Sequence, residues 1–262
     1  RVASRAVGAR GPGNNNGSRT LIQRRENSVF ALPPGATTQL TMDRAISAQE
    51  TMNMYLEIGR SGELLDDIRK DKESTSVANR WQRMLDIYFS TQLHVIHPFG
   101  YAGDQTGLQQ YTLGLTEIVQ QKGPEDAEVK ELQQLSRECW DTLLQRAFNV
   151  DSGQEDDFTV EKCRAVAAAC SQKMQSEEFL VQIDEKVKTL PVEQKQGALM
   201  ELIVPLHIDL MKPYGYEGED GYIKLQAAMM KYMGDPGIMS NMQAAMYAVT
   251  LRADLPMGPP SQ

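Results

Sequence analysis

The segment HPFGYAGD at residues 97–104 returns as KPYGYEGED at residues 212–220, each time after a long and mainly apolar run. A shift of the chain against itself by 115 residues aligns 61–105 with 176–220 without a gap. Apolar positions meet apolar positions over this length, and the prolines and glycines of the two segments coincide. Similarity at a fixed distance along a chain is typical of repeated structural units. We therefore expect a tandem duplication.

Helical signals fill the first copy. Thr41 is placed to cap a helix that Gly59 or Gly62 ends. A long apolar helix is expected over 77–96, because Pro98 follows and cannot continue it. These signals predict helices in sequence, separated by short connections.

The same signals continue through the rest of the chain. A helix is expected to end at Gly123, and the next to begin at Pro124 and the acids after it. The acidic segment 151–157 is interpreted as a linker, and five more helical segments are expected from about Phe158 onwards.

Composition supports a helical fold. Hydrophobic residues make up 41% of the 262 residues, enough for one or two cores, while aromatic residues are sparse at 6%. The Val-Ile-Thr alternation typical of strands is rare. The sequence predicts an all-α protein with two tandemly duplicated bundles of about five helices each, residues 42–150 and 151–262, after an extended arm.

That basic arm comprises residues 1–41. It holds six arginines and one acid, a charge of +5, so the net charge of −8 leaves −13 for the remainder. Without hydrophobic periodicity the arm alone cannot repay the entropy of ordering, so we expect it to lie across another subunit. Its composition is also that of the end of an organelle transit peptide, or of the segment after the cleavage site. The arm residues expected to contact a partner are Arg5, Arg10, Arg19, Arg24, Arg25 and Phe30.

A turn that leads the chain from one helix into the next, which we call a corner, explains most residues of the repeated segment. We expect its prolines to end one helix, its glycines to adopt positive φ angles and its acids to cap the next helix. In the second copy either Glu219 or Asp220 is placed for capping. The residues of this predicted structural loop are Pro98, Gly100, Gly103, Asp104, Pro213, Gly215, Gly218 and Asp220.

The aromatic residues of the two segments are less required by a turn. They either fill the gap between two helices or present a docking surface to a partner or an aromatic ligand. The predicted docking residues are Phe99, Tyr101, Tyr214 and Tyr216. We interpret the segments as structural corners, with a docking surface as the alternative and a catalytic loop as the least favoured reading.

Motifs of known chemistry are missing from the sequence. There is no GxxxxGK[ST] and no GxGxxG after a strand. The stretch EGEDGYI resembles the centre of a calcium loop, but Tyr216, Gly218 and Ala227 would then occupy ligand positions that need oxygen-bearing side chains. Three histidines are too few and wrongly spaced for an HExxH zinc site.

We interpret the sulfur-containing residues as core residues. Cys139, Cys163 and Cys170 suggest neither a disulfide framework nor a zinc site, so we expect buried thiols without a base nearby. The methionines near the C-terminus suggest copper or an adaptable binding surface, but three of them fall at helical spacing and favour core packing. These methionines are Met229, Met230, Met233, Met239, Met242 and Met246.

Three functional hypotheses follow. The first is a non-catalytic linker subunit that docks onto a larger complex through its arm and its helical repeats, because separate anchoring points raise avidity. The second is a soluble helical enzyme with a pocket between the repeats, and the third is a small-molecule or pigment-binding protein. We favour the linker subunit and expect no catalytic residue, no metal and no cofactor. The acidic body argues against nucleic acid as a partner, and no apolar run has the length of a transmembrane segment.

The arm, the Met-rich helices and the segment PYGYEGEDG resemble the nucleus-encoded accessory subunits of algal photosystem and light-harvesting antenna supercomplexes, in which helical linkers bridge core and antenna. The resemblance implies a chloroplast location, association with the thylakoid, and membrane-embedded photosystem or antenna proteins as partners. A mitochondrial complex is the alternative.

Overall fold

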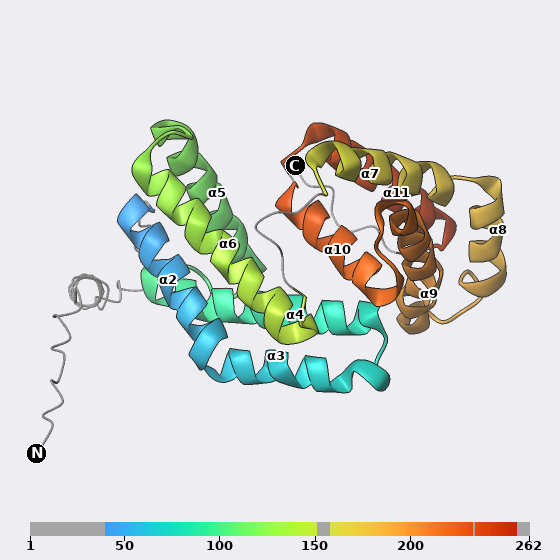
Figure 1. The fold of residues 1–262 in the computed structure, drawn as a ribbon, viewed down its shortest axis with the longest axis horizontal. Helices are drawn as coiled ribbons and strands as arrows, with labels where there is room; N and C mark the ends of the chain where they lie inside the picture. Colours follow the sequence, from blue (N-terminus) through green and yellow to red (C-terminus); the bar gives the residue numbers. More distant parts are fainter. Residues whose placement is uncertain (1–39, 151–157, 233, 256–262) are drawn as a thin grey trace, which may run out of the picture. The chain divides into compact units, whose positions relative to one another are not determined.

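The computed structural model describes residues 40–150, 158–232 and 234–255, and this part of the chain is entirely helical. It contains ten α-helices and three short 3-10 helices, and no strand lies within these ranges (Figure 1). The predicted all-α class is therefore confirmed. None of the helices in these ranges has the length and apolar character that crossing a bilayer requires.

The helices of the first half begin and end at local signals. Thr41 caps the first, its hydroxyl accepting a hydrogen bond from the Arg44 amide at 3.4 Å. Gly123, with φ 83°, follows the end of the fourth. The elements are α2 (Met42–Ile58), α3 (Arg60–Lys70), η1 (Asp71–Glu73), α4 (Val77–Ile96), η2 (His97–Phe99), α5 (Gln105–Lys122) and α6 (Ala127–Phe148).

The start of α6 differs from the prediction. The helix begins at Ala127 rather than at Pro124, because the Asp126 carboxylate accepts hydrogen bonds from the amides of Glu128 and Val129 at 2.9 and 3.3 Å. Asp126 therefore serves as the cap, and Pro124 lies in the turn before it.

The second half contains the five predicted helices. Thr159 and Ser176 cap the first two, each accepting a hydrogen bond from a backbone amide three residues later. The elements are α7 (Val160–Met174), α8 (Glu177–Lys186), α9 (Val192–Met211), η3 (Lys212–Tyr214), α10 (Gly218–Lys231) and α11 (Pro236–Arg252).

Contacts between residues divide the chain into two compact units. One holds the described part of Arg1–Ser61 with Phe89–Cys139, and the other holds Gly62–Tyr88 with the described part of Trp140–Gln262. The boundaries fall inside α3, α4 and α6, so each of these helices contributes residues to both units. The sequence repeats 42–150 and 151–262 remain a prediction.

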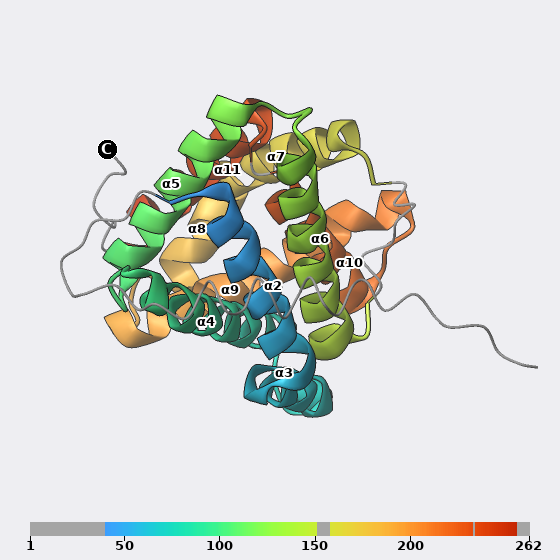
Figure 2. The same ribbon diagram turned by 90° about the vertical axis from the view of Figure 1, so that its left-hand side faces the viewer.

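In the first unit, α2 contacts both α6 and α4. It lies beside α6 in both ribbon views (Figures 1 and 2), and the Asn53 side-chain amide donates to the Leu135 carbonyl at 2.9 Å. Tyr55 packs edge-on against His94 of α4, with ring centroids 5.3 Å apart. Leu56 has no exposed surface, so α2 anchors the core of this unit.

In the second unit, α7 contributes to two hydrophobic cores. Cys163 and Val166 face one core with Phe158 and Met211, whereas Cys170 belongs to the other. The helix packs against α8, α9, α10 and α11, most extensively against α11. All three cysteines of the chain are free and buried, as predicted.

Candidate functional site

The two repeated segments form corners with the same backbone. Each follows a helix of 20 residues, α4 or α9, and each begins with one 3-10 turn. Gly100 has φ 92° and ψ 8°, and Gly215 has φ 85° and ψ 11°. In both corners the glycine amide donates to the carbonyl three residues earlier at 3.0 Å. Only glycine adopts this left-handed conformation without strain, which explains why it recurs at this position.

The helices after the corners start differently. Asp104 is the N-cap of α5, and its carboxylate accepts a hydrogen bond from the Gly107 amide at 3.1 Å. The N-cap of α10 is Glu217, whose side chain makes no capping hydrogen bond. The expectation that Asp220 caps this helix is wrong, because α10 begins at Gly218 and places Asp220 inside its first turn.

The glycines of the corners also differ in their backbone. Gly218 has φ 55°, so it shares the positive φ of Gly100 and Gly215. Gly103 does not, and the expectation of a positive φ angle there is wrong. The capped start of α5 needs extended backbone at Asp104 but no left-handed residue before it.

The corner aromatics pack inward. Tyr214 and Tyr216 lie edge-on against Phe158, with centroid separations of 5.4 and 6.0 Å, and Phe158 itself is buried. Tyr101 packs in the same manner against the buried Tyr111 at 5.4 Å. These tyrosines and Phe99 are half-buried. Packing therefore accounts for the three tyrosines, and docking by these residues remains a prediction.

The predicted docking residues of the arm lie outside the described residues. They are Arg5, Arg10, Arg19, Arg24, Arg25 and Phe30.

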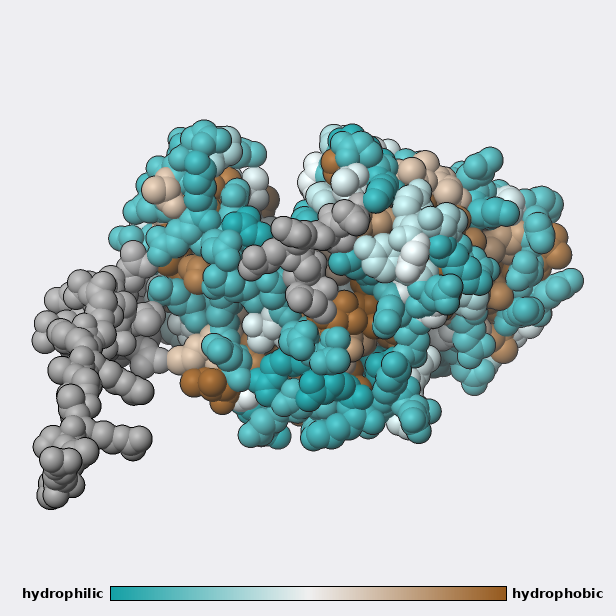
Figure 3. All heavy atoms as spheres, viewed as in Figure 1, coloured by the Kyte–Doolittle hydropathy of each residue, from teal (hydrophilic) through white to brown (hydrophobic). Residues whose placement is uncertain are grey.

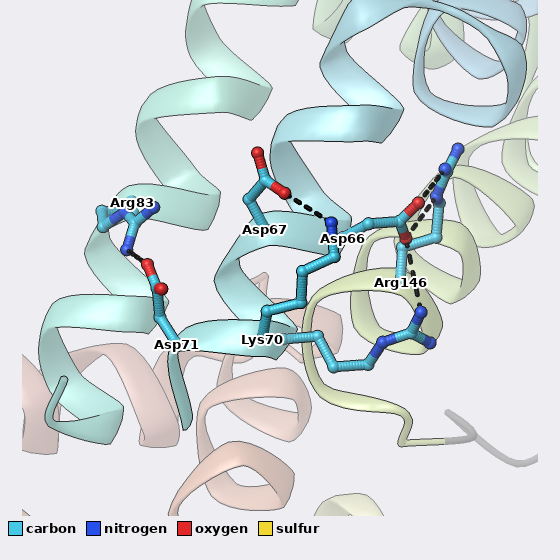
Figure 4. Close-up of polar contacts among 7 residues, drawn as sticks. Asp66, Asp67, Lys70, Asp71, Arg83 and Arg146 are labelled. Atoms are coloured by element: carbon cyan, nitrogen blue, oxygen red, sulfur yellow. Dashed lines mark hydrogen bonds and ion pairs between the residues drawn. The ribbon is translucent and has the colours of Figure 1, made fainter. Parts of the chain in front are cut away.

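A cluster of ion pairs joins α3 to its neighbours (Figure 4). The Arg146 guanidinium of α6 donates two hydrogen bonds to the Asp66 carboxylate, at 3.1 and 2.5 Å. These hydrogen bonds hold the pKa of the Asp66 carboxyl below its usual value. Arg83 of α4 pairs with Asp71 at 2.6 Å. Each member of the cluster has an oppositely charged neighbour, so the arrangement fastens helices rather than presenting a free charge.

Two buried lysines also make structural contacts. The Lys195 ammonium donates to the Ala253 carbonyl at 2.8 Å, so it satisfies the C-terminal end of α11. The Lys224 ammonium lies 5.8 Å from the ring centre of Tyr216. Neither lysine is arranged as a catalytic base.

The structure also brings together five residues that the sequence analysis did not connect. Cys170 Sγ lies 3.2 Å from Nε2 of His207, and the side-chain amide of Gln226 lies 3.2 Å from Nδ1 of the same ring. Cys170 Sγ also lies 3.4 Å from Met174 Sδ. Tyr222 stacks on the imidazole with ring centroids 5.9 Å apart. We call Cys170, Met174 and His207 the sulfur–imidazole cluster.

This cluster lacks the properties of a cysteine nucleophile. Cys170 is 2% exposed and His207 is 6% exposed. Burial raises the pKa of the Cys170 thiol to about 12 and lowers the pKa of His207 to about 4. A thiol and a neutral imidazole are therefore the stable forms, whereas nucleophilic catalysis needs a thiolate that a substrate can reach.

Sequence reasoning missed the cluster because no short motif connects its members. Cys170 and Met174 are one turn apart on α7, but His207 lies on α9 and Gln226 on α10. One partial signal exists: Cys163 and Cys170 are spaced for the same face of a helix, and that face is buried.

Comparison of the chain with protein-family models, with curated proteins and with solved structures finds no match. The class that the fold defines is an all-α protein.

Proposed function

We propose that this protein is a non-catalytic docking subunit of a larger protein assembly. The observation that carries the proposal is the outward face of α11. Met246, Tyr247 and Leu251 are 44%, 55% and 60% exposed there. We call these three side chains the α11 face.

The composition of α11 explains why this face favours a protein partner. The helix has no charged side chain before Arg252, its last residue. Ile238, Ala245 and Val249 face the core, so the apolar character of the opposite side is not needed for folding. The exposed side of α11 also carries the polar Ser240 and Gln243, so its large apolar side chains are confined to the α11 face. A cluster of exposed large apolar side chains marks a candidate interaction site. Figure 3 shows a mostly hydrophilic surface on the side it presents, with hydrophobic side chains in separate areas.

A tandem duplication would give the two halves a related helical framework. The boundaries of α9 and η3 lie 115 residues after those of α4 and η2, the same shift that aligns the sequence. Matching corners with Gly100 and Gly215 in the same conformation support a common origin of the two halves. Two helical units and an arm would bind one assembly more tightly than a single contact does.

The proposed setting is an organelle. We propose a chloroplast complex at the thylakoid, with photosystem or antenna proteins as partners, on the resemblance and on the Arg-rich composition of residues 1–41. A mitochondrial complex is the alternative. Fractionation of the source cells distinguishes the two.

The decisive experiment is native purification with variants of the α11 face. Tyr247→Glu combined with Leu251→Glu places two charges on an exposed surface, so the helical circular dichroism signal should be unchanged. We expect at least a tenfold loss of co-purifying partner, because a charge in an interface is costly. The matched control is Leu113→Glu, at another apolar side chain that is 64% exposed. A wild-type protein that purifies alone, or a double variant that keeps its partner, would overturn the proposal.

A further inference from the structure

The sulfur–imidazole cluster combines three donor types in one buried place. Its atoms are the Cys170 thiol, the Met174 thioether and Nε2 of His207, with 3.4 Å between the two sulfurs and 3.2 Å from the thiol to the nitrogen. Cys170 and Met174 are each 2% exposed. No group of three or more His, Cys, Asp or Glu with metal-binding geometry occurs in the described ranges, so hard oxygen ligands are not part of this cluster.

Donor chemistry selects the kind of metal. Thiolate and thioether sulfur prefer soft ions such as Cu(I), and imidazole accompanies them in copper sites, whereas Mg²⁺ and Ca²⁺ need oxygen ligands. The spacing of one helical turn places both sulfurs on the same face of α7, towards α9. Two rigid helices therefore hold the donors together without a loop.

The charge of the metal ion decides which ion the apolar surroundings favour. A monovalent cation bound to one thiolate forms a neutral unit, which the apolar surroundings tolerate. A divalent ion such as Zn²⁺ would leave one uncompensated positive charge in a core that contains Phe179, Ile183 and Val249. The surroundings thus disfavour Zn²⁺, even though zinc accepts cysteine and histidine ligands.

The neighbours of the histidine orient it for coordination. Gln226 contacts Nδ1, and Tyr222 stacks on the ring face, so the ring keeps Nε2 directed at the sulfurs. Outer partners of this kind hold metal-bound imidazoles in position. Because the two ends of an amide are interchangeable in such a contact, Gln226 Oε1 can accept the Nδ1 hydrogen once Nε2 binds a metal.

We propose that Cys170, Met174 and His207 bind one Cu(I) ion. The S–H bond of Cys170 breaks, a Cu–S bond forms and the proton leaves to solvent, while the imidazole moves its hydrogen to Nδ1. Copper remains Cu(I) throughout, so the step needs no oxidant or reductant. This site is independent of the docking role and would function with or without a partner protein.

The test is an anaerobic titration of the full chain with Cu(I) against a chromogenic Cu(I) chelator. We expect one tightly bound Cu(I) per chain, and X-ray absorption should show two sulfur ligands and one nitrogen ligand. Cys170→Ser should abolish the tight site, and Met174→Leu and His207→Gln should each weaken it at least about tenfold. Gln226→Leu should lower the affinity by about 10- to 100-fold, as for other outer-shell residues.

The control is Cys163→Ser, which removes another buried thiol of α7, in the core that contains Phe158 and Met211. This variant should bind Cu(I) like the wild type. Circular dichroism verifies folding, and Met174→Leu keeps the test valid if Cys170→Ser fails to fold, because it preserves volume. No Cu(I) retained against the chelator, an equal loss in Cys163→Ser, or equally tight Zn²⁺ binding would overturn the proposal.

Discussion

Arg80 near the start of α4 and Glu219 in the first turn of α10 form an ion pair with 2.7 Å between Nη2 and Oε2, although 139 residues separate them. Arg80 is 2% exposed, donates to the Thr75 carbonyl at 3.3 Å and lies 5.6 Å from the ring centre of Phe148. A guanidinium so deeply buried needs these partners, because an unpaired buried charge is costly.

Arg80→Leu should lower the free energy of unfolding by about 2 kcal/mol, less than for a fully buried pair because water still reaches Glu219. Urea denaturation followed by circular dichroism measures the change. Arg83→Leu is the matched control three residues further along the same helix, where both partners of the ion pair are exposed, and it should cost less than about 1 kcal/mol. Equal losses in the two variants would contradict the role assigned to Arg80.

Asp104→Ala should destabilise the protein by about 1 kcal/mol, because the Gly107 amide loses its capping partner. The control is Asp220→Ala in the other corner, where the carboxylate lies inside the first turn of α10 rather than at its N-cap, so about 0.3 kcal/mol is expected from the helix dipole. The unfolding midpoints of both variants measure the difference. If both changes had the same effect, the two helix starts would be equivalent, contrary to their geometry.

Gly215→Ala and Gly197→Ala add the same methyl group and should act in opposite directions. Gly215 has φ 85°, so alanine there should cost about 1 kcal/mol. Gly197 lies within α9 with open space around its Cα, so alanine should stabilise by about 0.5–1 kcal/mol through helix propensity. Thermal unfolding measures the change in stability of both variants. A stabilising effect of Gly215→Ala would contradict the left-handed conformation of Gly215.

The unfolding free energy of the metal-free protein should fall as the pH drops from about 6.5 to about 4. Burial lowers the pKa of His207 from 6.5 to about 4, so over this window the unfolded chain takes up a proton that the folded chain does not. The full effect is about 3 kcal/mol. The adjacent Cys170 and Tyr222, whose pKa values burial raises to about 12, stay uncharged throughout.

His207→Gln isolates this contribution, since the carboxylates titrate in both proteins. Chemical denaturation at pH 7.5, 6, 5 and 4 should give a difference between wild type and variant that shrinks as the pH falls. A constant difference across this range would exclude titration of the buried imidazole.

Local sequence signals were sufficient to predict most of the helix ends. Thr41 as a cap, Pro98 after α4 and Gly123 after α5 act within one helical turn, so the sequence places these ends closely. Three local expectations were wrong: the start of a helix at Pro124, the capping by Asp220 and the positive φ of Gly103. In the two corners the next helix starts at different positions, which the ungapped alignment does not reveal.

The all-α class, the buried state of the cysteines and most helix ends could be predicted from the sequence, because capping, glycine conformation and apolar periodicity act over a few residues. The contacts between distant side chains could not be predicted in this way. Arg80 meets Glu219, and Cys170 meets His207, because the rotation and packing of whole helices set these distances. The sequence also could not show which side of α11 is exposed. The helix has no charged residue before Arg252 to mark a solvent-facing side, and only its packing against α7 and α8 decides which side is buried.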